Sequence, residues 1–556
     1  MQDADRRRFW TYSLLGLILL GLTQKASGAD RIIERIEALR AGDPVMVLGA
    51  PLHSREALVE FYQGRNYEPA WESAGAREEL LAAIRDAASD GLIPADYHYG
   101  SLSEHALGEA LPESPEIRTD VDLLLSDAFL LLASHLRHGK LDPESRAPRW
   151  QSFDEHNDTL AELHTALLYN QVHARLERQK PSAPEYRKLV QLRKRISDLS
   201  GELWLPIGPG PAIRPGDADP RLPEIRRRLQ LLGDLPEPSG GTPEPGTDHY
   251  NDALLQAIPE FQARHGLEPD GVIGAKTLTE LNRLPLERLQ AIDANLERWR
   301  WLPDSLGGTY VLVNIAGFEL HLVENGRETL HQRVIVGGPY RQTPVFSDRI
   351  RYLVFNPTWT VPRRLMVEDQ LPLIQNDPAY LDRMGFKVYQ GWGADRIEVD
   401  PATIDWHALS RNNFPYQLVQ QPGPRNAVGQ VKFMFPNQYD VYLHDTPGQN
   451  LFRRSDRQLS SGCIRVERPF ELAQKLLQNN RNWGPSALDE ALGQTSPVNV
   501  VLDTPVPVHL LYWTVWVDQA GRYQFRDDIY GRDRQLTHAL RADWQGNLQL
   551  TPRSEG

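Results

Sequence analysis

The sequence has a single cysteine, Cys463, among its 556 residues. One cysteine cannot form an internal disulfide, so the stability of the protein has to come from hydrophobic cores. A metal cluster held by several thiolates is excluded for the same reason. Because cysteine is often a buried apolar residue, the role of Cys463 has to be judged from its flanking sequence.

Positive charge is scarce as well, because the net charge is −13 and no run of Lys or Arg outside the extreme N-terminus is long enough to neutralise a phosphate backbone. Such a chain has no stretch that could neutralise a nucleic-acid backbone, which disfavours nucleic-acid binding. The HExxH, paired Cys/His, GxGxxG and P-loop patterns are also missing from the sequence. We therefore expect no metal and no other cofactor.

The N-terminus has the layout of an export signal, which we place at residues 1–29. Three arginines, Arg6 to Arg8, precede an apolar stretch from Phe9 to Leu22 and the small residues Ala26 to Ala29. The apolar stretch is shorter than the roughly 20 residues that span a bilayer, which favours cleavage over a permanent anchor. The arginines leave both the general and the twin-arginine export routes open.

A chain of this length, with 40% hydrophobic and 24% charged residues, predicts about three soluble folded units. Residues 30–205 have apolar residues at helical spacing and predict a helical scaffold domain. Its aromatic residues near Trp71 are interpreted as core. A Pro/Gly-rich stretch, Pro206 to Pro215, separates this domain from residues 218–283, where three short helices are expected.

The segment from Tyr250 to Asn282 carries an ordered set of residues around a Pro-Asp-Gly turn. They are Phe261, Gln262, His265, Gly266, Asp270, Gly271, Gly274, Thr277 and Leu278. In this set the segment resembles the three-helix peptidoglycan-binding module. The resemblance implies that glycan or stem peptide binds near His265 and Asp270, although such modules also serve as packing spacers.

From Tyr310 onward apolar and polar residues alternate, which predicts strands, and Glu324-Asn325-Gly326 is typical of a hairpin. We expect a β-rich domain over residues 306–505, interrupted by an insertion at residues 362–429. Connections of this length often cover a site. Residues 506–556 are expected to form an extension, with a last strand pair, that packs on this domain. The predicted fold class is α+β multidomain.

The segment that points to chemistry contains His444 at the end of a predicted strand and Cys463 after the turn Ser460-Ser461-Gly462. A cysteine nucleophile needs a base or a positive charge nearby, and a histidine supplies either. Gly462 permits close backbone approach, so N–H groups of the turn could face a developing oxyanion. We therefore predict Cys463 to be a reactive thiolate with a low pKa.

This stretch resembles the active-site signature of the YkuD-type L,D-transpeptidases. The matching positions are His444, Ser460, Gly462, Cys463, Ile464 and Arg465. Ser461 stands where many members of the family have a second histidine, which puts any role for that histidine in doubt. Together with the scaffold, the module and the insertion, the chain resembles the large Gram-negative branch of this family.

The resemblance implies an enzyme of the periplasm of a Gram-negative bacterium. Its partners would be the stem peptides and the glycan of peptidoglycan. Cys463 would attack the bond after the third stem residue, usually meso-diaminopimelate, and release D-alanine. The amine of a second stem would then give a 3→3 cross-link, with His444 moving the proton. Carbapenems are expected to acylate Cys463, and other cell-wall synthesis proteins are possible partners.

Further site residues are assigned by position and by the same resemblance. The candidates for oxyanion or substrate contacts are Tyr442, Gly462, Ser461, Arg465, Asn356 and Trp359, and those in the lid are Tyr389 and Trp392. Tyr442 should share the strand face of His444, because side chains alternate along a strand. Asp445 should point to the opposite face, so we expect a backbone carbonyl to orient His444.

Three other interpretations stay open at this stage. The same nucleophile with water as acceptor would make an L,D-carboxypeptidase, and with a protein lysine it would make a protein-to-peptidoglycan ligase. A non-catalytic wall-binding scaffold is a third possibility, against which the intact His444, Gly462 and Cys463 argue.

Overall fold

The computed structural model describes residues 28–108, 111–142, 159–236, 248–481, 483–484 and 486–542. The expected export signal lies almost wholly outside these residues. No helix in the described part of the chain is long and apolar enough to cross a membrane. The chain divides into two compact units, one built mainly on residues 28–140 and 159–182 and one on residues 183–540.

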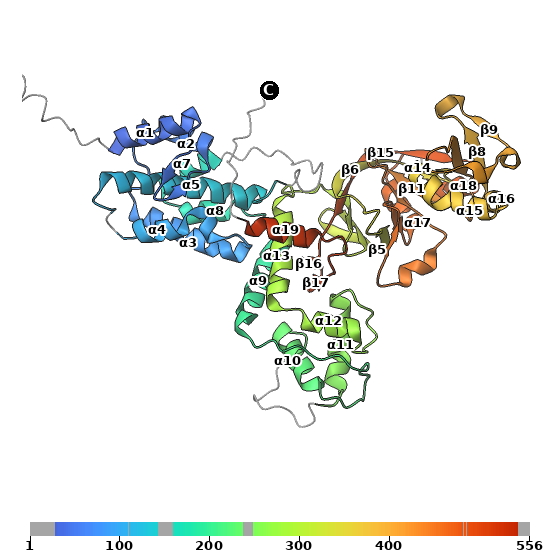
Figure 1. The fold of residues 1–556 in the computed structure, drawn as a ribbon, viewed down its shortest axis with the longest axis horizontal. Helices are drawn as coiled ribbons and strands as arrows, with labels where there is room; N and C mark the ends of the chain where they lie inside the picture. The colour runs from blue at the N-terminus through green and yellow to red at the C-terminus, as the bar shows by residue number, and fades with distance from the viewer. Residues whose placement is uncertain are drawn as a thin grey trace, which may run out of the picture. The chain divides into compact units, whose positions relative to one another are not determined.

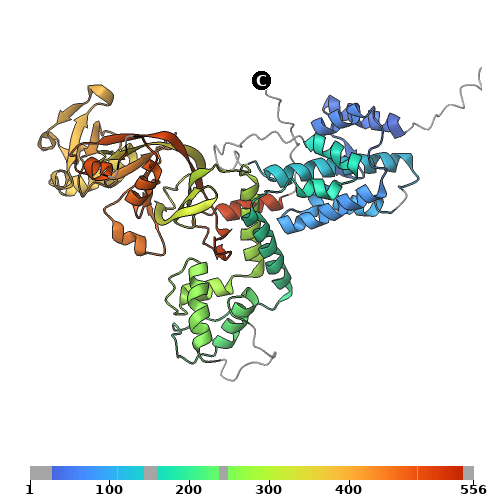
Figure 2. The ribbon, with the colours of Figure 1, turned by 180° about the vertical axis from the view of Figure 1, so that it is seen from behind.

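The first unit is a bundle of helices around α5 (Pro115–His138), drawn from blue to teal in Figure 2. The helices around α5 are α1 (Gly28–Ala41), α2 (Arg55–Gly64), α3 (Ala74–Asp86), α4 (Tyr99–His105), α7 (Thr159–Tyr169) and α8 (Val172–Glu177). A short hairpin, β1 (Met46–Val47) and β2 (Ala50–Pro51), adds to it. Side chains of α5 are buried on every side, as is typical of a central helix.

Two buried carboxylates of α5 tie loops to this bundle. Asp122 accepts hydrogen bonds from the Trp71 backbone N–H at 2.9 Å and from the Tyr62 hydroxyl at 2.6 Å. Asp127 contacts Nε2 of His98 at 2.8 Å. A buried carboxylate requires such partners, and Tyr62 and Trp71 are fully buried. The aromatic residues of this domain are therefore core, as the sequence indicated.

The second unit begins with helices that share one core. They are α9 (Pro184–Asp198), α10 (Leu222–Leu232), α11 (Asp252–Arg264), α12 (Ala275–Asn282) and α13 (Pro285–Arg300). Helices α10 to α12 are the three expected from the sequence. Residues of α9 were expected in the scaffold domain, but α9 packs along α13 within the second unit (Figure 1).

The β-rich part of the second unit is a nine-stranded sheet with the order β13-β5-β14-β12-β11-β6-β15-β3-β4. The strands are β3 (Thr309–Asn314), β4 (Glu319–Glu324), β5 (Arg327–Gly337), β6 (Phe346–Phe355), β11 (Val431–Met434), β12 (Leu443–His444), β13 (Gln458–Ser460), β14 (Ile464–Val466) and β15 (Val498–Leu511). Strand β4 also pairs with β5, so the sheet closes on itself around an apolar core. Helices α17 (Pro469–Leu477) and α18 (Ala487–Leu492) contribute to that core. The α+β multidomain class is confirmed.

The insertion after β6 folds as a small subdomain with its own apolar core. Its elements are β7 (Trp359–Thr360), α14 (Arg363–Leu365), a π-helix (Met366–Gln370), α15 (Leu371–Asn376), α16 (Tyr380–Met384), β8 (Phe386–Gln390), β9 (Ile397–Val399) and β10 (Tyr416–Gln420). The strands form a separate sheet in the order β7-β10-β8-β9. We call this subdomain, residues 359–429, the lid.

The C-terminal extension is divided between two cores. Val508 to Leu511 belong to β15 and run parallel to β3 in the closed sheet. The expected last strand pair exists as β16 (Val515–Val517) and β17 (Tyr523–Phe525), followed by α19 (Arg532–Arg541). Val515, Val517 and Phe525 of this pair enter the helical core of α9, α11 and α13, while Trp516 packs with Leu312 of the β-rich domain, so the pair contacts both.

Candidate active site

A cleft of about 1030 Å³ lies between the closed sheet and the lid. From the sheet it is lined by Lys432, Tyr442, His444, Cys463 and Arg465. From the lid it is lined by Val361, Leu365, Tyr380, Met384, Phe386 and Trp392. The cleft thus joins polar and ionisable groups on one side to a mostly apolar wall on the other.

Cys463 follows β13 in a tight turn that leads into β14. Gly462 has a φ of +120°, a backbone conformation that residues other than glycine rarely adopt. The Ser460 hydroxyl accepts from the Gly462 N–H at 3.2 Å and donates to the Cys463 carbonyl, while Thr343 Oγ1 donates to the Gly462 carbonyl at 2.8 Å. The Gly462 N–H is therefore engaged within the turn, which corrects its expected part as an oxyanion donor.

The thiol of Cys463 is protonated in the free protein. Its Sγ lies 3.7 Å from the carbonyl oxygen of Asp440. Burial raises the pKa of the thiol, and hydrogen bonds with Tyr442 and the charges of Lys432 and Arg465 offset only part of that rise. The expected resting thiolate with a low pKa is therefore wrong, so a base has to remove the proton during attack.

His444 lies on β12, which runs parallel to β14 with His444 opposite Arg465. The imidazole is 5% exposed, and burial together with the charge of Arg465 lowers its pKa to about 3. Its Nδ1 donates to the carbonyl of Asp445, as expected from the sequence. A carbonyl can only accept, so in the neutral ring the unprotonated nitrogen is Nε2. His444 is thus a neutral imidazole able to accept a proton.

Two cations and a tyrosine surround this pair. The Tyr442 ring lies 5.6 Å from the His444 ring between centroids, and Lys432 Nζ lies 5.1 Å from the Tyr442 ring centroid. Burial lowers the pKa of Lys432 and of Arg465, while the charge of Cys463 opposes the shift in both. The sequence analysis did not select Lys432, although its place between Val431 and Phe433 on one strand indicated a side chain on the cleft face.

Of the two remaining candidates, one lines the cleft and the other does not. Trp359 lines the cleft. Asn356 does not, because its amide donates to the carbonyls of Ala491 at 2.9 Å and Gln494 at 2.8 Å. Asn356 has a φ of +47° and its amide is held by these carbonyls, so it supports a turn outside the cleft in which it was expected to contact substrate.

The lid is tied to the nucleophile turn by Arg341. Its guanidinium contacts Asp369 of the lid at 2.7 Å and 2.9 Å, and Glu368 at 2.9 Å. The same group donates to the Ser461 hydroxyl at 3.0 Å, next to the nucleophile. Ser461 therefore links the lid to the turn. The sequence analysis missed Arg341, whose signal is only its place in the loop after β5.

The two aromatic residues expected in the lid differ in position. Trp392 is 53% exposed and lines the cleft. Tyr389 lies on β8 and packs under the guanidinium of Arg396, 4.4 Å from the ring centroid, and it is not among the residues that line the cleft. Tyr389 is thus part of the packing of the lid.

Of the two residues near which glycan or stem peptide was expected to bind, Asp270 is exposed, whereas His265, the residue after α11, is buried. His265 is 4% exposed and lies between the rings of Phe261 and Phe525, with centroid distances of 4.0 and 5.3 Å. Asp270 accepts from the Gln262 amide at 3.0 Å and so fixes the turn. Asp270 thus stabilises the turn of the module, and His265 packs the module against Phe525 of β17.

Comparison with known proteins agrees with this architecture. A model described as the YkuD "L,D-transpeptidase catalytic domain" matches residues 308–508, one described as "Scaffold domain" matches residues 56–192, and one described as "Putative peptidoglycan binding domain" matches residues 219–281. A curated protein of Haemophilus influenzae named "Putative L,D-transpeptidase" is 38% identical over 250 residues, which cover 45% of this chain. The match spans 49% of that relative's length.

Solved L,D-transpeptidase structures are similar at low sequence identity. One from Xylanimonas cellulosilytica is 15% identical, with 55% of this chain and all of that chain covered and a TM-score of 0.18. One from Stackebrandtia nassauensis is 14% identical, with 55% and 97% covered and a TM-score of 0.20. The family matches and the closed sheet lead to one conclusion. This chain carries a YkuD-type L,D-transpeptidase catalytic domain, preceded by a scaffold domain and a peptidoglycan-binding domain.

Proposed function

We propose that this protein is a cysteine-dependent L,D-transpeptidase that forms 3→3 cross-links between peptidoglycan stems in the periplasm, after export by its N-terminal signal. In the first step, Sγ of Cys463 bonds to the carbonyl carbon of the third stem residue. The bond to the terminal D-alanine breaks, and the thiol proton passes through His444 to the leaving amine. A thioester and free D-alanine result.

In the second step, the side-chain amine of another stem attacks the thioester carbonyl. The new amide bond forms, the C–S bond breaks, and the proton from the amine returns through His444 to the sulfur of Cys463. The protein ends in its starting state, with a thiol and a neutral imidazole.

The observation that carries this proposal is the joint presence of the thiol and a neutral imidazole in one cleft with two partly buried cations, Lys432 and Arg465. A neutral imidazole is ready to accept the proton that the thiol holds. Lys432 and Arg465 favour negative charge on the attacking sulfur, and in a site shielded from water such charges act more strongly. None of these groups needs to change its protonation state before substrate binds.

The lid favours an amine acceptor over water. Its apolar side chains cover the cleft, and exclusion of water protects a thioester from hydrolysis. A carboxypeptidase has no need for such a cover. This supports cross-linking over the carboxypeptidase reading, and the intact Cys463 and His444 oppose a non-catalytic scaffold.

Mass spectrometry of products formed from tetrapeptide muropeptides tests the proposal. We expect free D-alanine and a 3→3 dimer with the wild-type protein and neither product with Cys463→Ala. Tripeptide without dimer would assign a carboxypeptidase instead. Dimer formation by Cys463→Ala would refute the nucleophile.

Acylation by a carbapenem gives an independent test of the same nucleophile. Its strained carbonyl presents the same type of carbon to the thiol as the donor bond. Intact-mass measurement should show one adduct on the wild-type protein and none on Cys463→Ala. A wild-type protein that gains no mass after long incubation would count against a reactive thiol.

A further inference from the structure

A second cluster of ionisable side chains lies on the outer face of the closed sheet, away from Cys463. His321 of β4 stands directly opposite His331 of β5, and Glu319 precedes His321 by two residues on the same strand face. The two imidazole rings stack at 4.8 Å between centroids with an angle of 6°. Leu320 and Leu322 alternate with these residues and point into the core, so the cluster faces outward.

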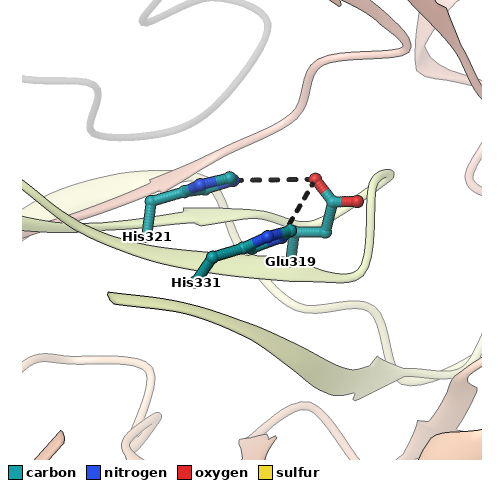
Figure 3. Close-up of side chains that lie close together, drawn as sticks. All are labelled: Glu319, His321 and His331. Carbon is teal, nitrogen blue, oxygen red and sulfur yellow. Dashed lines mark ion pairs between the residues drawn. The ribbon is translucent and has the colours of Figure 1, made fainter. Parts of the chain in front are cut away.

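The three side chains point at one another (Figure 3). Oε2 of Glu319 lies 3.6 Å from Nε2 of His321 and 3.8 Å from Nε2 of His331. The three atoms all lie within 4.8 Å of one another. In a tetrahedral zinc site with bonds of about 2.0–2.2 Å, the ligand atoms lie roughly 3.3–3.5 Å apart. The two Glu319 distances exceed this spacing by less than about 1 Å, and a turn of one imidazole ring out of the stack would direct both Nε2 lone pairs to one ion.

The atoms that point away from the centre are held by other groups. Nδ1 of His321 lies 2.7 Å from Oε2 of Glu328, and Oε1 of Glu319 lies 3.6 Å from Nη2 of Arg526. Metal-binding histidines are usually oriented in this way, by a carboxylate on the second ring nitrogen. With Glu328 and Arg526 on their outer atoms, Nε2 of His321 and Oε2 of Glu319 face each other at the centre of the cluster.

An irregularity in the strand pairing places Glu328 on this face. The register between β4 and β5 shifts between Leu322 and Val323, so that Glu328 pairs with Val323. Without the shift, Thr329 would take that position and Glu328 would point to the other face. Bulges of this kind often re-aim a side chain at a site.

The surroundings suit a divalent cation with an exchangeable ligand. The cluster lines a pocket of about 980 Å³, and His331 has half of its side chain exposed. Glu319 and Glu328 bring two carboxylates to the cluster, and the guanidiniums of Arg526 and Arg457 interact with Glu319, so these four charges balance once the imidazoles are neutral. Two imidazoles and one carboxylate match zinc in both number and type of ligand for a site that keeps one position open.

We propose that Nε2 of His321, Nε2 of His331 and Oε2 of Glu319 bind a zinc ion, with the fourth position open to solvent. Glu328 and Arg526 orient two of the ligands. The site lies on a hairpin of the catalytic domain and bridges, through Arg526, to the segment that follows β17. Zinc binding would therefore fasten this segment to the sheet and raise the thermal stability of the unit.

Calorimetric titration of the full chain with zinc sulfate tests this site. The titration uses Cys463→Ser, because a free thiol is itself a zinc ligand. Zinc binds the deprotonated imidazole, so the titration is carried out above the ordinary pKa of histidine. At pH 8 we expect one equivalent of zinc and a higher melting temperature. If the protein bound no stoichiometric zinc, the proposal would be wrong and the cluster would be only a network of ion pairs.

Variants in the same Cys463→Ser background locate the ion. His331→Ala should weaken zinc binding at least about tenfold, and Glu328→Gln about tenfold through loss of orientation. Both positions are partly exposed, and circular dichroism checks their folding. His407→Ala, which removes an exposed histidine from the lid, is the matched control and should bind as its parent does. Equal binding by His331→Ala and its parent would overturn the site.

Discussion

Two buried histidines of this protein, His444 in the catalytic domain and His265 in the peptidoglycan-binding domain, have the same protonation state and opposite surroundings. Burial lowers the pKa of both below the ordinary value. In both, Nδ1 bonds to a backbone carbonyl. Nε2 of His265, however, contacts Arg288 at 3.0 Å, while His444 lines the cleft that holds Cys463.

The comparison shows that a buried neutral imidazole is not by itself a sign of function. The imidazole of His265 lies between Phe261 and Phe525 and is a polar part of a core. Both of its nitrogens have hydrogen-bond partners. Beside a protonated thiol in a cavity the same group is a base. Three predictions sharpen this distinction.

The largest expected effect separates the two histidines directly. His444→Gln should lower the rate of carbapenem acylation by roughly 10²–10⁴-fold, because the thiol loses its base. His265→Gln should leave that rate within about twofold and lower the free energy of unfolding by about 1–3 kcal/mol, because Arg288 and the Phe261 carbonyl lose a matched partner. Stopped-flow acylation and thermal unfolding of both variants measure the two quantities. A loss of acylation in His265→Gln with unchanged stability would reverse the assignment.

A smaller effect concerns the link between the lid and the nucleophile turn. Asp369→Asn removes one of the two carboxylate charges that Arg341 pairs with and leaves Glu368, and the lid should open more often. We expect the ratio of tripeptide to cross-linked dimer to rise by about two- to fivefold, because such partly exposed pairs contribute little each. Glu398→Gln, which breaks the exposed pair with Lys387 elsewhere in the lid, is the control. If both variants gave the same ratio of tripeptide to dimer, Arg341 would have no part in keeping the lid closed over the cleft.

The smallest expected effect is a nearly flat pH profile. His444, with a pKa of about 3, stays neutral as pH falls from 8 to 5, and Cys463, whose pKa is raised, keeps its proton across the same range. The rate of carbapenem acylation should therefore change less than about threefold between pH 5 and 8. Measurement at constant ionic strength checks this. A tenfold fall per pH unit below pH 7 would instead indicate a resting thiolate.

The sequence predicted those parts of the molecule that local patterns determine. The spacing of apolar residues located α10, α11 and α12, and the turn before Cys463 pointed to a cysteine that lines the cleft. The length of the insertion indicated a lid. It did not indicate the sheet within the lid, because β7 and β9 are two and three residues long, too short for an alternating pattern to appear.

Long-range pairing and burial could not be read from local patterns. The partners of α9 and of the strand pair β16–β17 depend on which apolar faces meet, and one sequence leaves that choice open. The protonation state of Cys463 depends on its burial among Tyr442, Lys432 and Arg465, which come from other strands. The outer cluster was missed because His321 and His331 become neighbours only through the hairpin register.

The pairing of β3 with β15 has a consequence for how the catalytic domain is assembled. Val311, near the start of this domain, pairs with Val508, near its end, and the pocket residues lie between them in the sequence. A chain that stops at residue 505 contains Cys463 and His444 but leaves β3 as an open edge, so the ring of strands cannot close. We expect faster hydrogen exchange of the β3 amides in such a truncated chain. The C-terminal part of β15 thus closes the sheet of the catalytic domain, and this domain can finish folding only after residues 508–511 have been synthesised.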